Sequence, residues 1–433
     1  MNTFILNFLV PLVLVYWIWL LISNPKQFIL IFIIISPLIN LFWQYEVLGF
    51  TLIEIFSGIL PLVFVFVMFV KMSQGGWKWG KYHKLFLLIL IIFFIPIVKS
   101  MVAGEPMANA AKLFIKILCG YASYNIFINF FTLKDQKKLV YALLAGVSIV
   151  LAIAIVQILR GSGFVAYGDR LSLIGPYHDP GEFTRMSLLA IILVLPLIRL
   201  FRSGLQNNLR IGILVLAIVT LGFAISRNVV LSAAGVVVAY GLIRRKIVVS
   251  LLVIGLAAGL YVSSPSVQAQ YQGKLYYELQ YLQGNRNIVL EQLGSGRVGV
   301  WQRAITSFKK VSLFEQIFGS GQDIGPHGQL LGLLLGVGVL GLGAILYFYL
   351  RLFIDALKRL RKDRNNLAAV YCALLLVSFF ILMVASAPLT EFYHQIAFFA
   401  FVAMSEKNEQ EWKAVSRSRS LNSRAGVPAA IST

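Results

Sequence analysis

The chain has 433 residues, of which 59% are hydrophobic and 13% charged, and its mean hydropathy is +0.83. This composition excludes an ordinary soluble domain and is typical of a polytopic membrane protein. We therefore attribute the formal net charge of +21 to basic loops on the cytoplasmic side of a membrane, not to nucleic-acid binding.

Apolar stretches long enough to cross a bilayer recur along the chain. We expect an all-α polytopic fold with about 12–13 transmembrane helices. The candidate spans are Phe4–Ile22, Phe28–Trp43, Phe50–Val70, Leu85–Val98, Leu113–Phe131, Leu139–Leu159, Met186–Ile198, Ile211–Ile225, Val229–Ile243, Ile247–Val262, Leu330–Leu350, Leu367–Ala385 and Ile396–Met404.

Two long polar connections divide these spans into three groups. Lys and Arg gather in alternate short connections, such as Arg244-Arg245-Lys246 and the run from Arg351 to Arg364, which places these connections in the cytoplasm and the N-terminus outside. Both long loops then lie outside. The predicted organisation is 1–159, N-terminal transmembrane helices; 160–185, first long extracytoplasmic loop; 186–263, central transmembrane helices; 264–326, large extracytoplasmic loop with amphipathic helices; 327–404, C-terminal transmembrane helices; and 405–433, a disordered cytoplasmic tail.

The first long loop is dense in ionisable groups. It reads RGSGFVAYGDRLSLIGPYHDPGEFTRM and contains Arg170, His178, Asp179, Glu182 and Arg185. A solvated loop whose Gly and Pro residues set turns is the simpler interpretation. The number of ionisable side chains between two apolar spans favours a loop that binds anions and sugars.

Two further arginines lie where a helix is expected to begin on the outer side. Arg227, in Ser226-Arg227-Asn228, joins two spans, and an arginine that snorkels to lipid headgroups explains it equally well. Arg297 follows Gly294-Ser295-Gly296 and precedes an amphipathic helical pattern. Backbone N–H groups at a helix start together with a guanidinium suit a phosphate, although an ordinary helix-start arginine fits the loop as well.

His327 lies immediately before the apolar stretch that begins at Leu330. The positive end of a helix dipole disfavours imidazolium, so this ring is expected to stay neutral and able to accept a proton from a hydroxyl. A lone histidine is more often structural, and His178 is a second candidate base. The four histidines are scattered and are not spaced as a zinc site, so we expect no metal and no cofactor.

In this order, the motifs resemble the O-antigen ligase and O-antigen polymerase superfamily of bacterial membrane glycosyltransferases. The matching pieces are Arg170…Gly175-Pro176, Ser226-Arg227, Ser295-Gly296-Arg297 with Trp301, and GSGQDIGPHGQLLGLLLGVGVLG. They cover roughly 170–343, and the layout of many spans extends the similarity to the whole chain. The chain departs from the family at Gly328, where the family usually has Asn, and at His178-Asp179-Pro180-Gly181, where it often has Asn-Pro-Asn.

The resemblance implies a GT-C-like helical membrane fold in the bacterial inner membrane, with the active site on the extracytoplasmic side. It implies a donor glycan on undecaprenyl diphosphate, an acceptor glycan or glycolipid, and a chain-length regulator or other polysaccharide assembly protein as a further partner. His327 would be the catalytic base, and Arg170, Arg297 and Arg227 would bind the diphosphate. Polymerisation of repeat units is favoured over ligation of finished glycan to lipid A-core. A transporter of lipid-linked glycan is the alternative of another class, and it predicts polar residues along a path through the spans.

Overall fold

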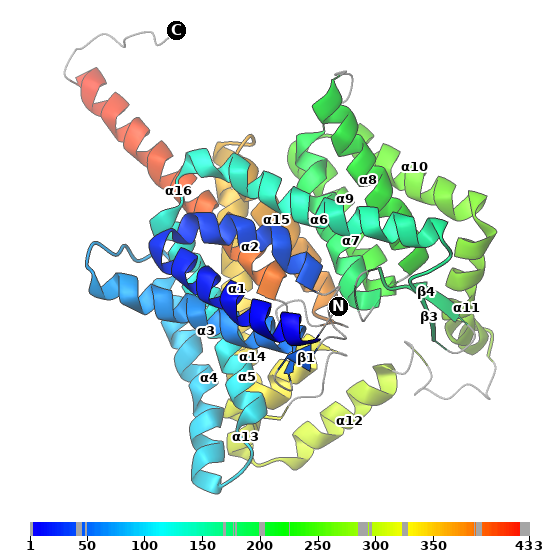
Figure 1. The fold of residues 1–433 in the computed structure, drawn as a ribbon, viewed down its shortest axis with the longest axis horizontal. Coiled ribbons are helices and arrows are strands. Elements are labelled where there is room, and N and C mark those ends of the chain that lie inside the picture. The colour runs from blue at the N-terminus through cyan, green and yellow to red at the C-terminus, as the bar shows by residue number, and fades with distance from the viewer. Residues whose placement is uncertain are drawn as a thin grey trace.

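The computed structural model describes residues 3–39, 46–47, 50–167, 170–175, 177, 180–198, 204–224, 226–284, 293, 297–322, 328–384, 386 and 392–424. Helices dominate this part of the chain (Figure 1). In chain order, the elements are α1 (Thr3–Ser23), α2 (Pro25–Ile39), β1 (Glu46–Val47), β2 (Phe50–Thr51), α3 (Leu52–Ser73), α4 (His83–Ala103), α5 (Ala108–Phe130), the 3-10 turn η2 (Leu133–Asp135), α6 (Gln136–Leu159), β3 (Phe164–Tyr167), β4 (Arg170–Leu173), α7 (Pro180–Val194), the 3-10 turn η3 (Leu195–Leu197), α8 (Leu205–Ala224), α9 (Arg227–Arg244), α10 (Ile247–Ser263), α11 (Pro265–Leu282), α12 (Arg297–Lys310), α13 (Leu313–Phe318), α14 (Gln329–Lys362), α15 (Leu367–Leu382) and α16 (Phe392–Arg424).

Every candidate span overlaps one of these helices. Within the described residues, six helices are long and apolar enough to cross a membrane: α4, α5, α6 with η2, α8, α9 and α14. Shorter apolar stretches lie in α1, α2, α3, α10 and α15. The protein is therefore a helical membrane protein, and the finer number of about 12–13 spans stays a prediction.

Local sequence signals set several helix boundaries. Pro25, Pro180 and Pro265 are the first residues of α2, α7 and α11, where the missing proline N–H costs no helical hydrogen bond. Gly104 ends α4 in the left-handed region, at φ 68°, and its N–H bonds to the last turn of the helix. These signals keep the connections short, so neighbouring helices pack side by side.

The helices pack through a continuous apolar core. Phe86 of α4 contacts Phe348 of α14, with ring centroids 4.6 Å apart, and Phe399 of α16, at 5.4 Å. On the other side of the bundle, the buried Tyr371 hydroxyl of α15 donates to the carbonyl of Leu193 in α7 (2.9 Å). The C-terminal helices α14–α16 therefore lie between the N-terminal and central groups (Figure 1).

Two short hairpins depart from the expected all-α fold. β1 pairs with β2, and β3 pairs with β4 in antiparallel register, with Phe164 opposite Leu173 and Tyr167 opposite Arg170. The sequence explains the second hairpin, because Gly168-Asp169 between the strands is a dipeptide typical of two-residue hairpin turns. The first long loop is thus partly ordered by a sheet that the helical pattern did not predict.

The predicted disordered tail is corrected over residues 405–424, which continue α16. Ion pairs and hydrogen bonds hold the first part of this helical extension. Arg359 of α14 donates to Glu409 (2.9 Å) and to the hydroxyl of Ser405 (3.1 Å), and Glu406 accepts bonds from the Lys81 backbone N–H (2.8 Å) and from the hydroxyl of Tyr124. Long-range polar contacts thus order a segment whose composition alone suggested disorder.

Glycines allow the chain before α14 to come close to the backbone of α14 itself. α14 is broken at Gly338, which has φ 70° and ψ −174°. A Cβ at Gly319 would collide with the carbonyl oxygen of Gly336, so the chain after α13 approaches α14 backbone to backbone. The Ser320 N–H donates to the Leu335 carbonyl (2.8 Å) at this contact.

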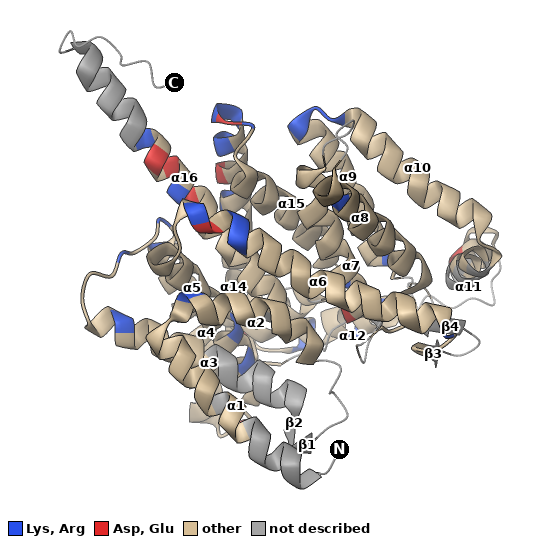
Figure 2. Ribbon diagram, turned by 45° about the horizontal axis from the view of Figure 1, so that its top comes forward, with Lys and Arg blue, Asp and Glu red and all other residues tan. Residues whose placement is uncertain are grey.

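Basic residues gather at one end of the bundle. Figure 2 shows Lys and Arg at the connection between α9 and α10 and along α16. The β3–β4 hairpin lies beside α11 at the right of Figure 1, and α12 lies below them. The helices therefore separate the basic end from the elements that carry the motif residues.

Candidate functional site at the β4, α9 and α12 starts

Arg227 is the first residue of α9 and forms an ion pair across the fold. Its guanidinium donates to Glu278 of α11, and the two side chains are 23% and 25% exposed. The sequence predicted Arg227 as a diphosphate ligand but did not indicate this carboxylate partner. A phosphate at the start of α9 would therefore have to share the guanidinium with Glu278.

Arg170 is the first residue of β4, and β4 packs against α8 and α11. The strand that begins with Arg170 and the helix that carries Glu278 are therefore neighbours, although the Arg170 side chain lies outside the described part of the structure. Gly175, at φ 57°, follows the hairpin, and a Cβ there would lie 2.6 Å from the Phe183 ring. This close contact packs the end of the hairpin against α7.

Of the other candidates in the first loop, some lie outside the described residues and some lie within them. His178 and Asp179 lie outside the described residues. Glu182 lies in the first turn of α7 and is partly exposed, whereas Arg185, one turn later, is 9% exposed. Arg185 is therefore part of the packed interior, and the loop does not present all its predicted ligands to one open surface.

A buried histidine that the motif analysis did not select lies beside Arg185. His394, near the start of α16, is 5% exposed, and its Nε2 is 3.4 Å from the Arg185 carbonyl oxygen. This contact could not be predicted from the sequence, because the two residues are 209 positions apart and belong to different periodic segments. The contact ties α16 to α7 at the end of the bundle that carries the motifs.

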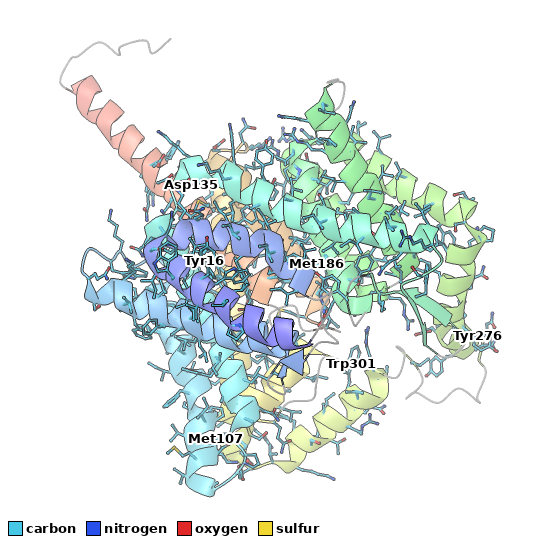
Figure 3. The ribbon with its side chains drawn as sticks, in the orientation of Figure 1. Tyr16, Met107, Asp135, Met186, Tyr276 and Trp301 are labelled. Carbon is cyan, nitrogen blue, oxygen red and sulfur yellow. The ribbon has the colours of Figure 1, made fainter. Side chains whose placement is uncertain are left out.

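α12 begins at Arg297, as the Ser-Gly-Arg pattern predicted. One turn later, Trp301 (Figure 3) faces the start of α14, since a Cβ on Gly328 would lie 3.2 Å from the indole Nε1. The Gln329 N–H donates to the Ser386 carbonyl (3.2 Å), which joins the start of α14 to the end of α15. His327 lies outside the described residues, but the residue that follows it is held between α12 and α15.

These contacts form two groups. The first joins β4 to α11, and α11 to α9 through Arg227 and Glu278, whereas the second joins α12 to the start of α14 through Trp301 and Gly328. Among the described residues, no group of three or more His, Cys, Asp or Glu side chains is arranged to hold a metal ion. Guanidinium groups at helix starts can bind and stabilise a phosphate without one.

No protein-family model matches this sequence, and no protein of curated function matches it. The motif resemblance and the contacts described above are therefore the grounds for a functional proposal.

Proposed function

We propose that the protein is a metal-independent glycosyltransferase of the O-antigen polymerase and ligase type in the bacterial inner membrane. It transfers a glycan from undecaprenyl diphosphate to an acceptor sugar hydroxyl on the extracytoplasmic side. Polymerisation of surface polysaccharide repeat units is the preferred reaction, and ligation of finished glycan to lipid A-core is the alternative. The motif order from Arg170 to Gly343 supports a transferase of this type, and the departure from the family at Gly328, directly after the histidine, favours polymerisation.

One observation carries the proposal: Arg227 and Arg297 each begin a helix. A helix start offers backbone N–H groups, and a guanidinium adds two parallel donors that match phosphate oxygens. In a departing diphosphate the negative charge grows during bond cleavage, so fixed cations stabilise the transition state more than the ground state. Arg170 at the start of β4, which packs on α11, would be the third cation.

His327 would act as the general base. The acceptor oxygen forms the new glycosidic bond while the bond between the anomeric carbon and the diphosphate oxygen breaks, and the electron pair leaves with the carrier diphosphate. The acceptor proton passes to the imidazole. Attack opposite the leaving group inverts the anomeric centre. His178 is the alternative base, and Asp179 and Glu182 are secondary candidates for sugar contacts. Arg185, which is packed in the interior, is not proposed for that role.

The test is complementation of a strain that lacks the gene, with surface glycan resolved on gels. His327→Ala, Arg297→Ala and Arg170→Ala are each expected to insert at normal levels and to fail to restore long glycan. Arg351→Ala is the matched control, because this arginine is 44% exposed near the opposite end of α14. Single repeat units on the acceptor would indicate a polymerase, and polymer retained on the carrier a ligase. Normal glycan in all three variants would refute the proposal.

A transporter of lipid-linked glycan predicts a polar path through the spans. Lys116 and Gln395 do line a cavity between α4, α5, α14 and α16, but its volume of about 10 Å³ holds about one water molecule. That volume is far too small for a sugar. Purified protein that moved lipid-linked glycan across liposomes without forming a glycosidic bond would favour the transporter.

A further inference from the structure

α13 exposes an unusually apolar surface for a connecting segment. Leu313, Phe314 and Ile317 are 73%, 49% and 40% exposed. A soluble loop that exposed three large apolar side chains within five residues would lose hydrophobic free energy and invite aggregation. These three residues are called the α13 apolar patch below, and they require an apolar environment.

Cationic side chains lie directly beside the patch. α12 ends with Lys309 and Lys310, both exposed, two residues before α13 begins. Apolar side chains next to lysines are the pattern of segments that lie in the plane of a membrane surface, where the lysines meet anionic headgroups. A protein partner would not need both an apolar patch and adjacent lysines. An anionic lipid surface offers acyl chains to the patch and headgroups to the lysines.

An ion pair holds α13 beside the end of a helix that could span a membrane. Glu315 forms an ion pair with Lys99 (2.7 Å), one turn before the end of α4, a helix long and apolar enough to span a membrane. Met101 and Val102, at that end of α4, are 70% and 84% exposed and extend the apolar surface. Figure 1 shows α13 beside this end of α4. The patch therefore continues a surface that a spanning helix would present to lipid.

Several backbone N–H groups of this segment are paired within the protein, which a lipid environment favours. Ser312 and Glu315 form a reciprocal capping box at the start of α13, and the Gly319 N–H bonds to the Glu315 carbonyl (2.7 Å). The N–H groups of Ser320 and Gly321 bond to α14 carbonyls at 2.8 and 3.1 Å. These bonds reduce the number of backbone groups that would lie unpaired in lipid.

We propose that α13 and the end of α12 form a membrane-surface anchor. The α13 apolar patch lies at the boundary between headgroups and acyl chains, and Lys309 and Lys310 bind anionic phospholipid headgroups. Through α12, the anchor sets the distance of Arg297 and Trp301 from the bilayer. The lipid contact does not depend on the transferase reaction, because it follows from exposed area, charge and backbone pairing alone.

The test uses a fluorescent label at Leu313→Cys, in a protein whose buried Cys119 and Cys372 are replaced by alanine. The protein is placed in nanodiscs of phosphatidylcholine and phosphatidylglycerol that carry a doxyl-labelled lipid quencher. Val102→Cys is the lipid-exposed control, and Glu411→Cys, on the exposed extension of α16, is the water-exposed control.

The label at position 313 is expected to be quenched by the doxyl lipid to within about twofold of the label at 102, and to resist reduction by dithionite. Quenching of the label at 313 is expected to increase with the content of phosphatidylglycerol. The double variant Lys309→Glu with Lys310→Glu is expected to lose this increase. A label at 313 that dithionite reduces as fast as the label at 411 would overturn the proposal. So would a label protected from dithionite but not quenched by lipid, since protein would then cover the patch.

Discussion

The buried guanidinium of Arg359 gives the sharpest prediction for stability. Its side chain is 4% exposed and donates to Glu409 (2.9 Å), to Ser405 (3.1 Å) and to the hydroxyl of Tyr82 (3.3 Å). Arg359→Met removes these donors and leaves the Glu409 carboxylate, 16% exposed, with Lys413 as its remaining ion-pair partner among the described residues. Breaking one side of a buried pair costs about 3–5 kcal/mol, because the remaining charge loses its compensation.

At an unfolding entropy of roughly 2 cal/mol/K per residue, that loss over 433 residues corresponds to a melting midpoint about 3–6 °C lower. Thermal unfolding in detergent micelles, followed by intrinsic fluorescence, measures this shift. Arg351→Met is the matched control: Arg351 is 44% exposed and 3.5 Å from Asp355, so its loss should cost at most about 1 kcal/mol.

A double variant, Arg359→Met with Glu409→Leu, should regain part of the lost stability, because it removes both charges together. Equal midpoints for Arg359→Met and Arg351→Met would refute the reasoning. The extension of α16 would then be held by something other than this buried network.

Three further predictions concern α14, α13 and the start of α9. Gly338→Ala should destabilise the protein, since its φ is 70° and a Cβ would collide with the Ile317 carbonyl, whereas Gly343→Ala, with nothing within 4 Å, should be neutral or slightly stabilising in the same melting assay. Hydrogen bonds from Lys99 and Ser312 lower the pKa of Glu315 from 4.5 to about 2. The stability that Glu315 contributes is therefore complete above pH 4.5 and lost as the pH falls towards 2, and Glu315→Gln should flatten that part of the melting profile. Arg227→Lys should retain more long surface glycan than Arg227→Ala, because a lysine keeps the charge but not the paired donors; equal loss in both would show that the planar guanidinium is essential.

The helical architecture could be predicted because its cause is local. A span needs about 20 apolar residues, and this requirement is visible in any window of the sequence. The start of α12 at Arg297 was predicted in the same way, from turn residues followed by an amphipathic repeat. The extension of α16 was not predicted, because Arg359 and Glu409 are 50 positions apart and no periodic pattern links them.

In the candidate site, too, local features could be predicted and long-range contacts could not. Sequence motifs selected Arg227 and Arg297, since a residue at a helix start is defined by its neighbours in the chain. The Glu278 partner of Arg227 and the contact between His394 and Arg185 depend on how separate helices pack, so a single sequence carries no sign of them. The β3–β4 hairpin was missed for another reason: its Gly-Asp turn lies in a loop that was interpreted by its charges, not by its strand pattern.

The glycine-rich start of α14 links the proposed base to the proposed membrane anchor. The chain is held on both sides of His327 in the sequence: the Gly321 N–H bonds to the Gly336 carbonyl (3.1 Å), and Gly328 packs against Trp301. These two held ends flank the proposed base. A bulky residue at Gly319 would separate α13 from α14 and release one of the two ends. Loss of long glycan in a Gly319→Val protein that still inserts would therefore report on the position of the base without any change to its chemistry.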